Sequence, residues 1–150
     1  MTDLWDGGCL CGKVRFRVRA PQEQVIACHC RQCRRMSGHY FAASAASWSD
    51  LELTETAGLA WYQSAETSRR GFCRLCGSSL FFDHGPDEPL GIAAGAFDEE
   101  PDFKLAAHIW VDEAGKYYEL CDGLPTYTEA EWLGGKGWRA YRHGEMNRLK

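Results

Sequence analysis

The chain has 150 residues, of which 45% are hydrophobic and 25% are charged, and its formal net charge is −4. This length fits one domain with a modest core, and the acidic balance excludes a nucleic-acid binder that relies on the release of counterions. No stretch approaches the roughly 18 apolar residues of a membrane helix, and the first residues lack the basic start and apolar run of a signal peptide. We therefore expect a cytoplasmic protein with neither a membrane nor a nucleic-acid partner, while its oligomeric state stays open.

Short strands are predicted along most of the chain. In the first, at 14–19, Val14, Phe16 and Val18 alternate with basic residues, which is typical of a strand with one face against a core. Further strands are predicted at 25–27, 40–44, 51–54, 59–62, 79–82, 91–94 and 107–111. A single short helix is indicated near 128–132, with a cap at Thr126 or Thr128. Many short strands with turn residues between them predict an all-β fold.

No repeat, low-complexity segment or linker divides the chain. We expect residues 1–135 to form one zinc-binding domain, for reasons given below. Residues 136–150 contain five basic side chains against one acidic side chain and are expected to form a polar basic tail in solvent.

Seven of the eight cysteines fall into three clusters. In a reducing compartment, clustered cysteines more often bind metal than form disulfides. Two of the clusters are pairs, Cys9 with Cys11 and Cys73 with Cys76, and four thiolates are the complement of a closed, structural zinc site. An extended backbone would point Cys9 and Cys11 to the same side, and Gly77 suits a tight turn that needs a positive φ. The alternative is that one pair is a redox couple.

The middle cluster supplies three thiolates, from Cys28, Cys30 and Cys33. Three protein ligands leave a fourth position on a zinc ion open to substrate. The same strand alternation directs His29 away from this metal, with direct ligation by His29 as the alternative. The alternative is a second structural zinc that is closed by a remote ligand, for which the candidates are Cys121, His39, His84 and His108.

Charged and isolated residues around the clusters allow more than one role. Three arginines flank the middle cluster, and they either offset its negative charge or bind the carboxylates of a small anionic thiol: Arg31, Arg34 and Arg35. Cys121 is expected to be a small buried hydrophobic residue, with a fourth ligand or a reactive thiol as alternatives. His108 is expected to be a hydrogen-bonded histidine on a strand.

Three segments of the chain resemble signatures of one family. The segments 7–16, 28–38 and 72–80, followed by 95–98 and 108–110, are similar in order to those of the glutathione-dependent formaldehyde-activating enzymes. The resemblance implies an Mss4-like β-tent of folded antiparallel sheets stapled by zinc. It also implies a structural zinc and a second zinc that glutathione approaches, with the ligand sets Cys9, Cys11, Cys73, Cys76 and Cys28, Cys30, Cys33 respectively.

The predicted function follows from this resemblance. The chain is expected to be a carbon–sulfur lyase similar to S-(hydroxymethyl)glutathione synthase, in which glutathione or a similar thiol is the co-substrate and adds to a small aldehyde. The residues expected to carry the reaction are the ligands of the open zinc, Cys28, Cys30 and Cys33. The residues expected to bind glutathione are Arg31, Arg34, Arg35 and His108. The alternative is a non-catalytic, zinc-stabilised module that binds glutathione or a protein.

Overall fold

The chain is described by a computed structural model that covers residues 4–134. These residues divide into two compact units, unit 1 with residues 4–23 and 43–103, and unit 2 with residues 24–42 and 104–134. Within the described part of the chain, no helix is long and apolar enough to cross a membrane. Each unit contains one of the two predicted cysteine sites, so each is described by itself.

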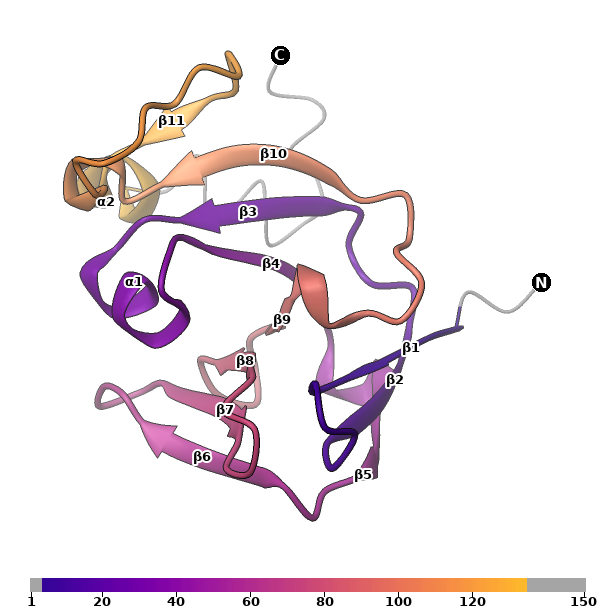
Figure 1. Ribbon diagram of the computed structural model, residues 1–150. Coiled ribbons are helices and arrows are strands. Elements are labelled where there is room, and N and C mark those ends of the chain that lie inside the picture. The colour runs from indigo at the N-terminus through magenta and orange to yellow at the C-terminus, as the bar shows by residue number, and fades with distance from the viewer. Residues whose placement is uncertain (1–3, 135–150) are drawn as a thin grey trace. The chain divides into compact units, whose positions relative to one another are not determined.

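Unit 1 is built from antiparallel strands (Figure 1). One sheet joins β1 (Leu4–Gly8), β2 (Arg15–Arg19) and β5 (Leu51–Glu55). The other strands pair in the order β4 (Phe41–Ala46), β9 (Leu90–Ala93), β8 (Ser79–Asp83), β7 (Arg69–Cys73) and β6 (Leu59–Gln63). Two 3₁₀ turns, Trp48–Asp50 and Ala94–Ala96, interrupt the strands.

The core of unit 1 forms on the apolar face of β2. Val14, Phe16 and Val18 are at most 1% exposed, and the ring of Phe16 meets those of Phe81 and Phe97 edge-on. Cys9 and Cys73 belong to the same buried cluster. The first cysteine site therefore reaches into the packed interior of its unit through two of its four cysteines, while Cys11 is exposed.

Unit 2 contains three parallel strands and two short helices. β10 (Lys104–Ile109) lies between β3 (Gln24–Cys28) and β11 (Thr126–Tyr127), and β3 and β10 are seen side by side in Figure 1. The helix α1 (Arg31–Ser37) follows β3, while a 3₁₀ turn (Val111–Glu113) follows β10 and α2 (Glu129–Leu133) follows β11. A small core of Ile26, Ala107, Ile109 and Trp132 holds the unit together.

The predicted all-β class is confirmed, and every predicted strand is present with its ends shifted by a few residues. The strand predicted at 107–111 ends at Ile109, because Trp110 turns the backbone into the left-handed region with φ of 54°. The helix near 128–132 is present as α2 and is capped by Thr128. The basic tail predicted at 136–150 lies outside the described residues, and the single domain at 1–135 stays a prediction.

The prediction missed three strands and one helix. β1 and β11 have no alternating pattern, and β7 begins with two arginines, of which Arg70 is buried and stacks on the ring of Phe82. The helix α1 was not predicted, because its seven residues are mostly polar and show no apolar period. Its two ends are set by Cys30, which caps the first turn, and by Gly38, whose φ of 88° ends the helix.

Candidate metal centres

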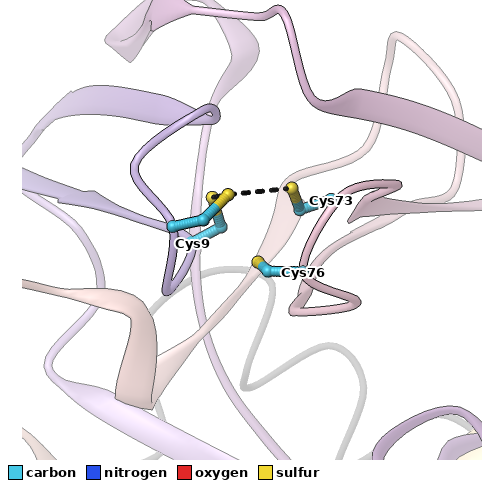
Figure 2. Close-up of side chains that lie close together, drawn as sticks. Cys9, Cys73 and Cys76 are labelled. Atoms are coloured by element: carbon cyan, nitrogen blue, oxygen red, sulfur yellow. Dashed lines mark hydrogen bonds between the residues drawn. The ribbon is translucent and has the colours of Figure 1, made fainter.

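The four cysteines predicted to form a closed site come together in unit 1. The sulfur atoms of Cys9, Cys11, Cys73 and Cys76 all lie within 4.8 Å of one another. Figure 2 shows the side chains of Cys9, Cys73 and Cys76 directed toward a common centre. Two of the sulfur–sulfur distances are 3.6 Å, between Cys9 and Cys11, and 3.7 Å, between Cys11 and Cys73.

This arrangement fits a tetrahedral zinc ion. A Zn–S bond of about 2.3 Å in tetrahedral geometry requires sulfur atoms about 3.8 Å apart. The two shortest separations are within a few tenths of an ångström of that value. The donor set therefore suits zinc, although the pattern of thiols alone does not exclude another thiophilic metal.

The path of the backbone at this site differs from the prediction. Cys9 and Cys11 do not lie on an extended segment, because residues 10–14 form a turn. Each cysteine pair instead ends in a glycine of positive φ, Gly12 at 79° and Gly77 at 81°. The backbone N–H of each glycine bonds back to the carbonyl of the first cysteine of its pair. The thiols converge because two similar turns curl toward each other, and the positive φ expected at Gly77 is confirmed.

Two residues that support this site were not identified from the sequence. The Ser78 hydroxyl lies 3.2 Å from the Cys76 sulfur and also accepts a hydrogen bond from the backbone N–H of Leu10, so it links the two turns. Its hydrogen bonding lowers the pKa of Cys76 to about 5, which favours the thiolate that a metal requires. Gly58 is buried against Cys73, and a Cβ atom there would lie 2.7 Å from the sulfur. Nothing in a single serine or glycine distinguishes it before the fold is known.

The three cysteines of the middle cluster also come together, in unit 2. The sulfur atoms of Cys28, Cys30 and Cys33 lie within 4.8 Å of one another. Cys28 ends β3, and Cys30 precedes α1, where its sulfur accepts a hydrogen bond from the backbone N–H of Cys33 at 3.2 Å. Hydrogen bonding with Cys30 and Cys33 raises the pKa of the Cys28 thiol. Crowded thiols of this kind suit a metal cation, which holds them as thiolates.

The remote residues considered as a fourth ligand do not join this cluster. Within residues 4–134, no histidine, aspartate, glutamate or further cysteine places a ligand atom in the group. Both ring nitrogens of His29 are engaged elsewhere, with Tyr118 and His108, in agreement with the expectation that it faces away from the metal. Cys121 was expected to be buried, and this is wrong, because its side chain is exposed.

The three arginines near this cluster occupy different environments. Arg31 and Arg35 are exposed, whereas Arg34 is half-buried. The Nε atom of Arg34 is buried and has no hydrogen-bond partner in the part of the chain that the structure describes. The backbone N–H of Arg31 donates to the Glu113 carboxylate at 2.7 Å, which ties the start of α1 to the turn after β10. The three arginine side chains therefore have different surroundings.

A pocket of about 400 Å³ in unit 2 combines polar and aromatic side chains. Its lining comprises His39, Tyr40, His108, Tyr118, Glu119, Leu120, Cys121 and Asp122. Of these, only His108 was predicted to bind glutathione, and it is a buried strand histidine with hydrogen bonds on both ring nitrogens, as expected. Tyr40, Tyr118 and Asp122 were missed, although the polar and aromatic run at 117–122 was a signal that could have identified this wall.

Comparison with known proteins agrees with this description. A family model described as the glutathione-dependent formaldehyde-activating enzyme matches residues 4–113. The chain is 23% identical over 128 residues to an uncharacterized lyase of Schizosaccharomyces pombe, with 85% of this chain and 93% of that protein covered. It is 29% identical over 147 residues to a Halomonas elongata protein named provisionally as a glutathione-dependent formaldehyde-activating enzyme, with 86% of this chain and 94% of that protein covered.

One solved structure resembles the chain as well. A crystal structure of a Rhodobacter sphaeroides protein is 25% identical to it, with a TM-score of 0.53, and the match covers 82% of this chain and 99% of that protein. The folded β-sheets with few helices, together with two cysteine clusters that could hold zinc, bear out the predicted fold. Because the family model spans well over half of the sequence, the chain belongs to the glutathione-dependent formaldehyde-activating enzyme family.

Proposed function

We propose that the chain is a zinc-dependent carbon–sulfur lyase, in which a glutathione-like thiol bound at the Cys28–Cys30–Cys33 cluster adds to a small aldehyde. The observation that carries the proposal is the incomplete ligand set, three thiols with no fourth ligand among residues 4–134. The lyase and formaldehyde-activating names of the relatives support the reaction class. Zinc held by the three thiolates would supply a position at which a substrate thiol ionises.

Ionisation of the thiol by the metal can raise the reaction rate only by a limited factor. A free thiol with a pKa near 8.5 is only about 3% ionised at pH 7, so complete ionisation raises the reactive fraction at most about thirty-fold. Larger accelerations require that the thiol and the aldehyde be held together. Side chains of unit 2 must supply that positioning.

Arg34 is the residue we propose to hold a carboxylate of the thiol. It lies on α1 one residue after Cys33, and its buried Nε has no acceptor among the described residues. A guanidinium presents N–H groups in a planar fork that matches a carboxylate. Arg31 and Arg35, which are exposed, would contribute mainly positive charge around the anionic cluster. His108 would act from the wall of the pocket.

Two broader expectations belong to the same proposal. The zinc-binding domain would comprise residues 1–135, followed by the basic tail of 136–150. The enzyme would work in the cytoplasm, where reduced thiols are abundant and disulfides are disfavoured.

Native mass spectrometry of the full chain, with and without millimolar glutathione, tests the proposal. We expect two zinc ions and one non-covalent glutathione per chain. Cys30→Ser should retain one zinc and lose the glutathione, and because serine is also a good N-cap, α1 keeps its start. Cys121→Ser serves as the matched control and should keep both zinc ions.

Turnover is then measured with the wild-type chain and a panel of small aldehydes. Formation of a hydroxyalkyl thioether adduct supports the enzyme, whereas bound glutathione without turnover on any aldehyde supports the non-catalytic binding module. Two zinc ions without glutathione would contradict the open site, and so would a folded Cys30→Ser protein that keeps both metals.

A further inference from the structure

The pocket of unit 2 combines aromatic rings with carboxylates. Its volume of about 400 Å³ lies in the range of small-molecule sites. The rings come from His39, Tyr40 and Tyr118. The carboxylates come from Glu119 and Asp122, and among the described residues neither a lysine nor an arginine lines the pocket. Such a lining favours a ligand that carries a positive charge.

The three rings pack against one another and are held in place. The ring centroids of His39 and Tyr40 lie 4.3 Å apart, and those of His39 and Tyr118 lie 4.8 Å apart. The Tyr118 hydroxyl lies 2.5 Å from Nδ1 of His29 and accepts the backbone N–H of Gly115 at 3.3 Å. An aromatic ring attracts a cation through its quadrupole. Rings that are already fixed lose little entropy when such a ligand binds.

The two carboxylates of the pocket are open to solvent. The side chain of Asp122 is 41% exposed, and hydrogen bonding with His108 and with the backbone N–H of Leu124 lowers its pKa, so that it is ionised at neutral pH. Glu119 is exposed as well. A cation in the pocket would therefore meet negative charge together with aromatic rings. Aromatic rings recognise methylated ammonium groups in other proteins, and negative charge strengthens the attraction.

The aromatic wall also packs against the segment that carries the open cysteine cluster. The ring centroids of Tyr40 and Tyr118 lie 4.9 Å and 5.4 Å from that of His29. His29 stands between Cys28 and Cys30 in the chain. The pocket is therefore a neighbour of the site proposed for the thiol, and it is available to the second reactant.

We propose that this pocket binds a methylated ammonium group, and that the electrophile of the reaction is an aldehyde that carries one. The assignment to the electrophile rests on the proposed function, whereas the cation site rests on the lining of the pocket. In the addition, the C–S bond forms, the C=O π electrons move to oxygen, and the proton lost by the thiol ends on that oxygen. The reaction therefore needs no further reactant, and it leaves the ammonium group unchanged.

Arg34 links the two reactants. Burial raises the pKa of Tyr118, and the positive charge of Arg34 opposes that rise, so this charge reaches the aromatic wall. A carboxylate of the thiol on Arg34, as proposed above, would offset the charge. Glutathione should therefore strengthen the binding of a cation in the pocket about twofold. Competition between the two would place the ammonium group of glutathione in the pocket and overturn the assignment to the electrophile.

Choline and its uncharged isostere 3,3-dimethylbutan-1-ol test the cation site without any assay of activity. NMR titrations of the full, zinc-loaded chain at about pH 8, above the usual pKa of an imidazole, give both dissociation constants. We expect choline to bind about tenfold more tightly than the alcohol. Equal affinities, or no binding of choline in the millimolar range, would overturn the proposal.

Two variants locate the cation site within unit 2. Tyr40→Leu removes a ring but keeps an apolar side chain, and it should weaken choline binding about fivefold, the scale of one cation–π contact. Glu119→Gln removes one charge and should weaken choline binding about threefold. The matched control is Glu129→Gln, at an exposed position of α2 outside the pocket, which should leave both affinities unchanged. The alcohol reports general damage to the pocket, so a choline preference that survives in both pocket variants would overturn the proposal.

Turnover is then compared for two aldehydes of the same shape, trimethylammonioacetaldehyde and 3,3-dimethylbutanal, with glutathione as the thiol. The ammonium group also activates the neighbouring carbonyl, so the ratio of the two kcat/KM values in the wild type is compared with the same ratio in Glu119→Gln. We expect the preference for the charged aldehyde to fall about threefold in the variant. An unchanged ratio would overturn the assignment to the electrophile.

The outcomes separate this inference from the proposed function. Turnover of both aldehydes by a chain that binds choline and the alcohol equally well would overturn the cation site and leave the lyase assignment standing. A choline preference that depends on Tyr40 and Glu119, in a chain that turns over neither aldehyde, would support the cation site and overturn the lyase assignment together with the role of the electrophile.

Discussion

The two cysteine sites use the same side chain in surroundings that differ in almost every other respect. In unit 1, Cys9 and Cys73 belong to an apolar core that also contains Phe16 and Phe81, Cys76 packs against that core, and Cys11 is exposed. In unit 2, three thiols flank a buried polar histidine, and the apolar core consists of only four buried residues. The number of ligands and the polarity of the surroundings, rather than the ligand type, therefore distinguish the site that we propose to be structural from the site that we propose to be catalytic.

The largest expected effect tests the difference between the two sites by removing one thiol from each of them. Cys73→Ser should prevent unit 1 from folding, because a structural zinc contributes roughly 10–16 kcal/mol of apparent binding energy, as much as the whole net stability of a domain. Cys30→Ser should lose one metal and stay folded. Circular dichroism melting and metal analysis measure both effects, and a soluble Cys73→Ser protein with an unchanged Tm would contradict the structural role.

The small core of unit 2 offers the second test. Trp132 lies on α2 and is 1% exposed, and its ring packs against the ring of Tyr127. Trp132→Ala should lower the free energy of unfolding by about 3–5 kcal/mol, the usual cost of removing a buried aromatic ring. Leu133→Ala is the control, because Leu133 is 61% exposed and its loss should cost less than about 0.5 kcal/mol. Equal effects in denaturant titrations would mean that Trp132 does not anchor the unit.

Unit 1 also contains a buried charge whose effect depends on pH. Burial alone would raise the pKa of Asp83, but hydrogen bonds from Arg69, Gly85 and Trp48 outweigh it and lower the pKa below 3.8. A carboxyl with a depressed folded-state pKa stabilises the protein above its unfolded-state pKa, and this contribution is lost as the pH falls through the folded-state value.

Asp83→Asn should therefore lower the free energy of unfolding by about 1–2 kcal/mol at pH 7, after allowance for the partly exposed Arg69. The difference from the wild type should shrink as the pH falls below 3.8. Chemical denaturation at several pH values measures it. Asp87→Asn, at an exposed position of the loop that follows β8, is the control, and a difference that grows toward low pH would refute the assignment.

The smallest expected effect is the difference between Arg34 and Arg35 in glutathione binding. Arg34→Ala should weaken glutathione binding to the zinc-loaded chain about tenfold, which corresponds to about 1.4 kcal/mol, because a carboxylate of glutathione would lose the guanidinium that we propose as its partner. Arg35→Ala, at an exposed position of the same helix, should weaken it less than threefold. Isothermal titration calorimetry gives both affinities, and a larger loss for Arg35→Ala would reverse the assignment.

The sequence alone predicted the all-β class, because strand alternation such as that of Val14, Phe16 and Val18 depends only on which side of a strand faces water. It also determined the grouping of the thiols, because each short-spaced cluster is brought together by a single turn, and Gly77 marked one such turn. The family signatures lie in these same local segments, so they were readable from the chain as well.

The supporting contacts around the sites and the burial of individual side chains could be seen only in the tertiary structure. Ser78 and Gly58 support the first site through contacts with residues distant in the sequence, and a hydrogen bond joins His29 to Tyr118, which lies 89 positions away. The burial of Arg34 and the exposure of Cys121 likewise depend on which segments pack against them. Local spacing carries no information about such contacts, because they form only when segments far apart in the chain pack together.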